Sequence, residues 1–326
     1  MRVAGVVLGL GLLLQAPIVR RPPIKPVQPD EESQQQQPVD EGKVPTIRVE
    51  TRLVNVAVNV VDKTGAPVGG LQQSDFEILE DGKPQKIAYF EKESTTPLSI
   101  VLAIDASESV LRNESLEKNA AKRFVNTLLR EQDELDLMDF SDTVREIVPF
   151  TNQKKKIEAG LNQIQRGAET ALFDAVYLAS DRLSQTRNDA GRRRVLVLIT
   201  DGSDTAKRSR YGQALEQAQR AAAMIYSIII VPVWADAGRD TGGEHALVQL
   251  SNDTGGKYFY VEDKRDLEPA FARVSDDLRT QYVIGYYAPQ RGRDTSFRSV
   301  KVRMKDPALQ REYDLRHRSG YYADGK

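Results

Sequence analysis

Five residues with hard oxygen donors are spaced so that they could hold a divalent cation. They are Asp105, Ser107, Ser109, Thr170 and Asp201. The first three form an Asp-x-Ser-x-Ser pattern at the end of the apolar run 100–104, and Asp201 follows a second apolar run, 195–199. Thr170 lies in a Gly-containing loop just before a helical pattern. Carboxylates and hydroxyls are the ligand type that Mg²⁺ prefers.

The elements around these residues predict that they converge. Short, fully apolar runs indicate strands buried on both faces, and they alternate with amphipathic helical patterns. Strands are expected at 100–104, 135–140, 144–150, 195–199, 226–233 and 257–261, and helices at 107–130, 154–164, 171–183, 213–223, 245–250 and 267–280. This alternation predicts an α/β fold with a doubly wound, mostly parallel sheet. Loops at the carboxyl edge of such a sheet meet at one crevice, so two carboxylates and three hydroxyls would surround one point.

The segments on either side of the α/β region have a β pattern. Residues 46–96 alternate apolar and polar positions between turns, and so do 282–287, 297–304 and 313–316. Each part alone is small for a stable core. We therefore expect N-terminal and C-terminal strands to combine into a small β-sandwich-like domain, into which the α/β domain is inserted. The alternative is two separate small β units.

The N-terminal residues indicate export. Arg2 is followed by the mostly apolar stretch 3–14, which suits a signal peptide and is too short to span a bilayer. We place a signal peptide at 1–16 and a disordered Pro/Gln-rich linker at 17–45. The β-domain then occupies 46–96 and 282–326, and the α/β domain 97–281. The predicted location is periplasmic, cell-envelope or secreted, and a retained N-terminal anchor is the alternative.

Composition narrows the function classes. The chain has 326 residues, of which 40% are hydrophobic and 29% charged, which is enough for a sizeable core. A net charge of -1 gives no reason to expect nucleic acid or an anionic membrane as partner. The chain has no Cys and only two His, which excludes thiolate chemistry and disfavours a zinc site. Membrane contact is expected only through a retained anchor, and composition leaves the oligomeric state open.

The motifs resemble a known family. Asp-x-Ser-x-Ser, the Thr170 loop and the Ile-Thr-Asp-Gly end of the second buried strand look like the metal-ion-dependent adhesion site of von Willebrand factor A (VWA) domains, over about 97–281. The resemblance implies that Ser107 and Ser109 bind the metal directly, and that Thr170 does so in the ligand-competent state. Asp105 and Asp201 would act largely through water. It further implies Mg²⁺ (or Mn²⁺ or Ca²⁺), a protein partner that presents Asp or Glu, and a last helix, 267–280, that shifts on binding.

The flanking β segments resemble a bacterial group of exported VWFA-related proteins, over about 46–325. This group implies an architecture and a compartment but no activity. The function that we predict is therefore a non-enzymatic, metal-dependent protein-binding module of the cell envelope, for adhesion or scaffolding. Two alternatives stay open: a Mg²⁺-dependent hydrolase, and a structural scaffold whose metal site is unused.

Other charged residues near the motifs have plainer interpretations. Four acids are close in sequence to the candidate ligands: Glu108, Asp142, Asp174 and Asp204. Glu108 and Asp204 could line the rim of the site, and the alternative is that all four are solvated or form turns. The hydroxyls could also simply cap helices. The triplet 192–194, all Arg, is expected to be a solvated segment before a strand.

Overall fold

The structure is a computed structural model. It describes residues 53–92, 96–107, 114–186, 192–231, 241–289 and 295–323, with side chains from 118 onward in the first helix and without that of Lys264. The predicted signal peptide and linker, and the candidate residues Glu108 and Ser109, lie outside these ranges.

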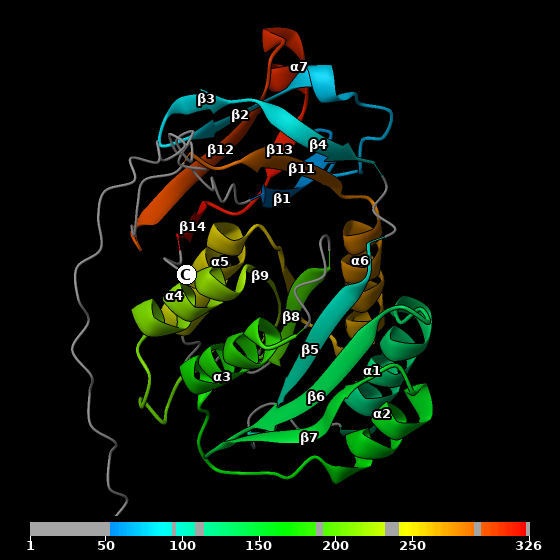
Figure 1. Ribbon diagram of the computed structural model, residues 1–326. Helices are drawn as coiled ribbons and strands as arrows, with labels where there is room; N and C mark the ends of the chain where they lie inside the picture. The colour runs from blue at the N-terminus through cyan, green and yellow to red at the C-terminus, as the bar shows by residue number, and fades with distance from the viewer. Residues whose placement is uncertain are drawn as a thin grey trace, which may run out of the picture. The chain divides into compact units, whose positions relative to one another are not determined.

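A mixed six-stranded sheet forms the centre of the α/β region (Figure 1). In sheet order its strands are β10 (Tyr258–Val261), β9 (Ala223–Ile230), β8 (Arg193–Thr200), β5 (Leu98–Asp105), β6 (Glu134–Phe140) and β7 (Val144–Thr151). All neighbours pair in parallel except β6 and β7, which are antiparallel. The carboxyl ends of β5 and β8 therefore lie side by side, as predicted.

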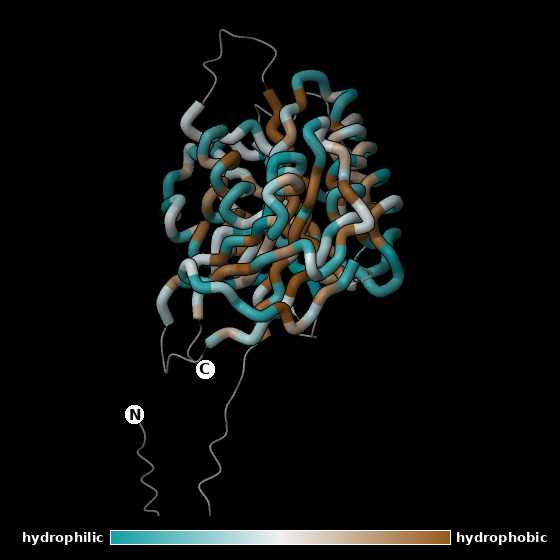
Figure 2. The backbone as a smooth tube through the Cα atoms, turned by 90° about the horizontal axis from the view of Figure 1, so that it is seen from above, coloured by the Kyte–Doolittle hydropathy of each residue, from teal (hydrophilic) through white to brown (hydrophobic). Residues whose placement is uncertain are grey.

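Helices cover both faces of this sheet (Figure 1). One layer contains α1 (Glu114–Leu128), α2 (Lys154–Gly160) and α6 (Leu267–Arg279), and the other contains α3 (Leu172–Ser184), α4 (Tyr211–Ala221) and α5 (Thr241–Thr254). Alternate residues of β5 serve the two layers: Ile100 and Leu102 pack in the first core, Val101 and Ala103 in the second. Figure 2 shows the most hydrophobic backbone in these central strands. The predicted fold class is confirmed.

Two four-stranded antiparallel sheets form the β-sandwich. Their orders are β13 (Asp314–Arg316), β1 (Leu53–Val61), β11 (Tyr282–Tyr287), β4 (Ile87–Glu91), and β14 (Gly320–Tyr322), β12 (Phe297–Met304), β2 (Phe76–Glu80), β3 (Lys83–Gln85). Each sheet combines strands from both ends of the chain, and both contribute to one core around Phe76, Tyr282 and Tyr286. The alternative of two separate β units is therefore wrong.

Several elements differ in detail from the prediction. The strand β2 turns back into β3, whereas the predicted strand at 87–90 is β4 and joins the other sheet. The strand β9 begins at Ala223, three residues earlier than expected. The helix α7 (Pro307–Glu312) was not predicted, although Asp306 caps it, accepting from the Ala308 N–H at 2.8 Å, and Pro307 opens it.

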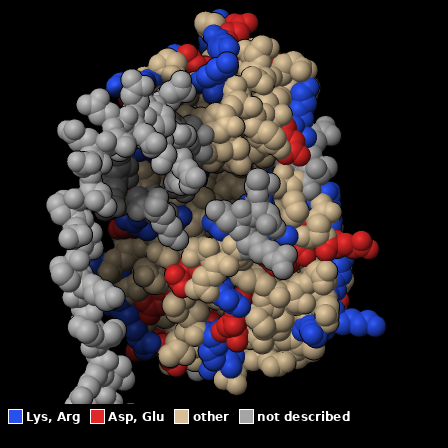
Figure 3. Space-filling view, in the orientation of Figure 1, with Lys and Arg blue, Asp and Glu red and all other residues tan. Residues whose placement is uncertain are grey.

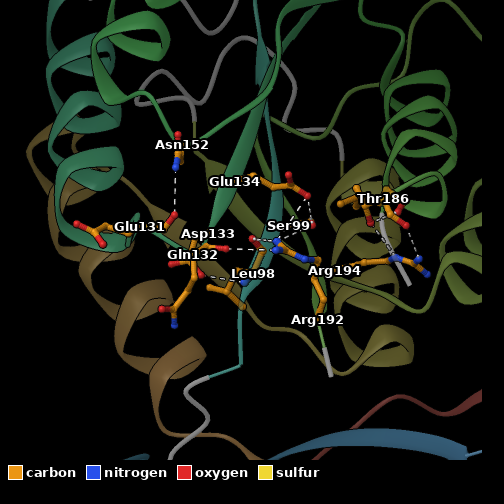
Figure 4. Close-up of polar contacts among 11 residues, drawn as sticks. Leu98, Ser99, Glu131, Gln132, Asp133, Glu134, Asn152, Thr186, Arg192 and Arg194 are labelled. Carbon is orange, nitrogen blue, oxygen red and sulfur yellow. Dashed lines mark hydrogen bonds and ion pairs between the residues drawn. The ribbon is translucent and has the colours of Figure 1, made fainter. Parts of the chain in front are cut away.

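The Arg triplet at the start of β8 is not solvated, which corrects the prediction. The side chain of Arg192 donates to the carbonyls of Leu98 and Gln132, at 3.2 and 3.3 Å, as Figure 4 shows. Arg193 is only 7% exposed and donates to the carbonyl of Leu278 at 2.9 Å. All three guanidinium groups lie at the amino edge of the sheet, opposite the candidate site.

Two of these arginines bind helix ends. Leu278 belongs to the last turn of α6, and Arg194 donates to the carbonyl of Ala221, the last residue of α4, at 3.0 Å. Arg194 also reaches the carbonyl of Thr186, just after α3, at 3.2 Å. The last carbonyls of a helix lack intrahelical partners and carry partial negative charge. Arg193 and Arg194 therefore bind carbonyls at or just after the ends of three helices from one strand.

Asp133 completes this edge from a fully buried position. Its carboxylate accepts from the backbone N–H groups of Leu98 and Arg130, at 2.8 and 3.0 Å, and from Arg279 at 2.7 Å. Arg279 in turn donates to the carbonyl of Leu128, the last residue of α1, at 2.6 Å.

Within the described ranges, no helix is both long and apolar enough to cross a membrane.

We expect Asp133→Ala to lower the free energy of unfolding by about 3–5 kcal/mol. The substitution removes the acceptor of the mostly buried Arg279 guanidinium and of the Leu98 N–H. Chemical denaturation with circular dichroism measures this change. The control is Glu268→Ala, which removes the exposed ion pair with Arg123 and should cost no more than about 1 kcal/mol. Equal losses for the two variants would contradict this account of the edge.

Candidate metal site

Asp105 is the last residue of β5, and its side chain is completely buried. One carboxylate oxygen accepts from the Ser107 N–H at 2.9 Å, and the other accepts from the Thr200 hydroxyl at 2.7 Å. The pKa of Asp105 is raised to about 7, mainly by burial and in smaller part by the nearby negative charge of Asp201, against the hydrogen bonds from Thr200 and Ser107. No positively charged side chain is among the described groups that shift the pKa of Asp105.

Asp201 follows β8, the strand beside β5, and is 9% exposed. It accepts from the Ser203 N–H at 3.2 Å, and the next residue, Gly202, has a left-handed φ of +93°. A Cβ on Gly202 would lie 3.1 Å from the backbone nitrogen of Glu244, in the first turn of α5, so glycine is required both by φ and by space. The close turn holds Asp201 beside Asp105.

The loop that carries Thr170 is hydrogen-bonded to the segments that follow β8 and β5. The Thr170 N–H donates to the Thr205 hydroxyl at 2.8 Å, and its carbonyl accepts from the N–H groups of Thr205 and Ala206, at 3.0 and 3.2 Å. On the other side, the Gly167 N–H donates to the carbonyl of Ala106 at 3.2 Å, which places Gly167 beside Ser107. Thr170 and Ser107 are 3% and 2% exposed. Four of the five predicted ligands therefore occupy adjoining loops at one edge of the sheet.

The nearby acids position the loop that carries Thr170. Asp204 accepts from the Leu172 N–H at 2.9 Å and so caps α3, and burial raises the pKa of Asp204. Asp142 accepts from the Glu169 N–H at 2.6 Å. These contacts fit the predicted turn-forming alternative, while Asp174 is half-buried in the first turn of α3. Whether Asp204 also borders a bound metal stays a prediction.

The sequence of residues 99–273, more than half of the chain, matches the von Willebrand factor type A domain family. The chain belongs to this family. VWA domains generally mediate protein–protein interaction and are typically not enzymes. No curated protein matches the sequence.

Solved structures with the same fold have low sequence identity to this VWA protein. The hypothetical protein BatB from Bacteroides thetaiotaomicron is 17% identical over 55% of this chain and 99% of its own, with a TM-score of 0.42. The vWF domain of the type V pili tip protein Mfa5 from Porphyromonas gingivalis is 12% identical over 57% and 96%, with a TM-score of 0.46. Proximal thread matrix protein 1 from the mussel byssus, described with a zinc-occupied MIDAS motif, is 15% identical over 62% and 50%, with a TM-score of 0.48.

The donors at this edge are hydroxyls as much as carboxylates. In the part of the chain that the structure describes, no three His, Asp or Glu side chains form a group that could hold a metal on their own. The predicted site instead combines two carboxylates, Asp105 and Asp201, with the hydroxyl residues Ser107, Ser109 and Thr170. Ser109 lies outside the described residues, so its place beside the other four is untested.

Three residues that hold the site were missed from the sequence. Thr200 binds Asp105 directly, Thr205 holds Thr170, and Asp139 accepts from the Gln165 N–H at 2.9 Å and pairs with Arg145. Thr200 carried a usable signal, because a hydroxyl in the last position of a buried apolar strand needs a polar partner. Thr205 and Asp139 carried none, since the loop residues that they hold, Thr170 and Gln165, are 35 and 26 residues away.

We expect Thr200→Val to lower the free energy of unfolding by about 1–3 kcal/mol, because it removes the hydrogen bond to one oxygen of a buried carboxylate without changing the side-chain shape. Thr200→Ser keeps the hydroxyl and is the matched control. Urea titration of both variants compares them. If valine is tolerated as well as serine, the Thr200 hydroxyl does not support Asp105.

Proposed function

We propose that this VWA protein is a non-enzymatic binding module that captures an acidic side chain of a protein partner through a divalent cation. The cation would be held by Asp105, Ser107, Ser109, Thr170 and Asp201. The observation that carries the proposal is the buried Asp105 carboxylate, which lies near a second buried carboxylate and has no positive side chain among the described groups that shift its pKa. Such a pair of acids is costly to bury without a compensating cation.

The donor types fit Mg²⁺, and Mn²⁺ or Ca²⁺ as substitutes. Mg²⁺ binds few protein oxygens and keeps several waters, so two or three hydroxyls with carboxylates behind them are a suitable set. In this proposal Ser107, Ser109 and Thr170 bind directly, while Asp105 and Asp201 act largely through water. Neutral direct ligands leave the bound cation able to accept a carboxylate oxygen from a partner. The chain holds these oxygen donors in place: Thr200 binds Asp105, Thr205 binds the Thr170 backbone, and the turn at Gly202 positions Asp201.

A hydrolytic role finds less support in the described residues. His317 is half-buried in the β-sandwich, where its Nε2 accepts from the Val302 N–H at 3.0 Å, and burial lowers its pKa. His245 is exposed on α5. Neither imidazole contacts Asp105 or Asp201, so no histidine is in place as a general base. The proposed partner-binding role needs no such base.

The N-terminal sequence supports a place outside the cytoplasm. The apolar stretch 3–14 after Arg2 suits a signal peptide or an anchor. We propose that the protein is exported and acts in the periplasm, at the cell envelope or as a secreted protein, in keeping with the exported VWFA-related group that its flanks resemble. The partner is then another envelope protein with an accessible Asp or Glu.

Metal binding is tested directly by titrating the EDTA-stripped full chain with Mn²⁺ in a calorimeter. We expect one site, and about tenfold or weaker affinity in Ser107→Ala, which removes one direct ligand. Ser184→Ala, at the far end of α3, is the matched control and should bind as the parent does. Absence of Mn²⁺ binding by the folded parent protein would refute the proposed site.

Partner binding is tested by capture from a bacterial envelope extract, with and without EDTA. A partner of the proposed kind is retained with Mg²⁺, released by EDTA and lost with Ser107→Ala or Asp105→Ala. Circular dichroism shows whether the Asp105 variant folds, and the Ser107 variant decides the outcome if it does not. Retention that is indifferent to EDTA and to both variants would argue against a metal-mediated contact.

A further inference from the structure

An exposed basic cluster borders the proposed metal site on one side. It consists of Lys207, Arg208 and Arg210, in the segment that connects Asp201 to α4. No acidic residue occurs between Asp204 and Glu216. None of the three side chains forms an ion pair with a residue that the structure describes. On the face in Figure 3 basic and acidic side chains are interspersed.

Backbone hydrogen bonds place this cluster next to Thr170. The N–H of Ala206 donates to the Thr170 carbonyl at 3.2 Å, and Lys207 is the next residue. The N–H of Lys207 also hydrogen-bonds to Asp204, which lowers the pKa of that carboxyl against the effect of burial. Asp204 caps α3 directly after the Thr170 loop. The basic cluster therefore begins at the edge of the proposed site.

The backbone at Lys207 shows that packing does not explain its presence. Lys207 has a left-handed φ of +50°, which glycine or asparagine adopts at lower cost than lysine. Its side chain is exposed and makes no ion pair with a described residue. A lysine held in such a position gains nothing from burial, and unfavourable backbone conformations persist mainly where a site uses them. The remaining contribution of this side chain is its charge toward solvent.

Acidic side chains lie around the start of α3. Glu169 is exposed, and Asp142, which accepts from the Glu169 N–H, is half-buried. Asp174, in the first turn of α3, is near enough to Asp204 to raise the pKa of that carboxyl. A ligand with several carboxylates would be repelled by these acids and attracted by the basic cluster, so its further carboxylates are favoured only at the basic cluster.

We infer that the partner presents its metal-binding Asp or Glu within an acidic segment whose further carboxylates lie against Lys207, Arg208 and Arg210. This inference rests on the proposed function and specifies the class of partner. Exposed charges at the rim of an interface act mainly on the association rate and lose their effect in high salt. The basic cluster therefore selects acidic segments over isolated acidic residues.

The test uses two synthetic peptides of equal length in Mg²⁺, one with a single Glu among Gly and Ser, the other with four consecutive Glu. We expect the four-Glu peptide to bind the full chain more tightly at 50 mM NaCl. The charge reversal Lys207→Glu with Arg208→Glu should weaken it by about tenfold at low salt and by less than about twofold at 500 mM NaCl. Lys207→Asn removes one charge with a residue suited to the backbone, and guards against misfolding.

The matched control reverses two exposed lysines of α2, Lys155→Glu with Lys156→Glu, at the opposite edge of the sheet. It changes the net charge equally and should leave binding unaltered. Equal binding of both peptides, still sensitive to EDTA, would overturn this inference and leave the proposed function intact. Four-Glu binding that depends on the basic cluster but ignores EDTA would overturn the metal contact alone. If an oligothymidylate competes with the four-Glu peptide as well as free four-Glu peptide does, the basic cluster binds phosphates instead. If neither peptide binds, both this inference and the proposed function are overturned.

Discussion

All eight residues of β5 are buried, so this strand requires a layer of helices on each side and a neighbouring strand on each edge. That requirement fixes the position of Asp105, the only ionisable residue of the strand, at its carboxyl end. Burial at this position raises the pKa of Asp105, and the buried carboxylate needs hydrogen-bond donors from the surrounding chain. Thr200, from the adjacent strand, and the Ser107 N–H provide them, and the remaining parts of the candidate site are arranged around this pair.

The two edges of the sheet have opposite electrostatic character. At the amino edge, Arg193, Arg194 and Arg279 meet carbonyls at the ends of α1, α4 and α6 and just after α3. At the carboxyl edge, Asp204 accepts from the first N–H groups of α3, and Asp201 lies beside the first turn of α5. Both arrangements follow from the same helix polarity in parallel βα units. They leave the acidic and hydroxyl groups of the candidate site at the edge where ligands of such sheets bind.

Apolar periodicity was enough to predict the architecture, because the strands β5 and β8 are buried on both faces and the β-sandwich strands alternate. It also brought Asp105, Thr170 and Asp201 to one edge, since chain order and sheet edge determine their positions. Apolar periodicity could not predict which groups the polar side chains bind. Three consecutive arginines read alike whether solvated or bound, and the carbonyls of Ala221 and Leu278 that Arg194 and Arg193 bind lie 27 and 85 residues away. Thr205 holds Thr170 across 35 residues, and neither carries a local pattern.

The sandwich and the VWA domain meet at the end of α6, away from the candidate site. Asp277, in the last turns of α6, is 6% exposed and accepts from Tyr226 of β9 and from Arg316 of β13, while Asn59 of β1 donates to its carbonyl. A shift of α6 on partner binding, which the resemblance implies, would either break this buried network or carry the sandwich along. Separating buried, hydrogen-bonded charges is costly. Movement of helix and sandwich together would keep the contacts of Asp277 with Arg316 and Asn59 intact.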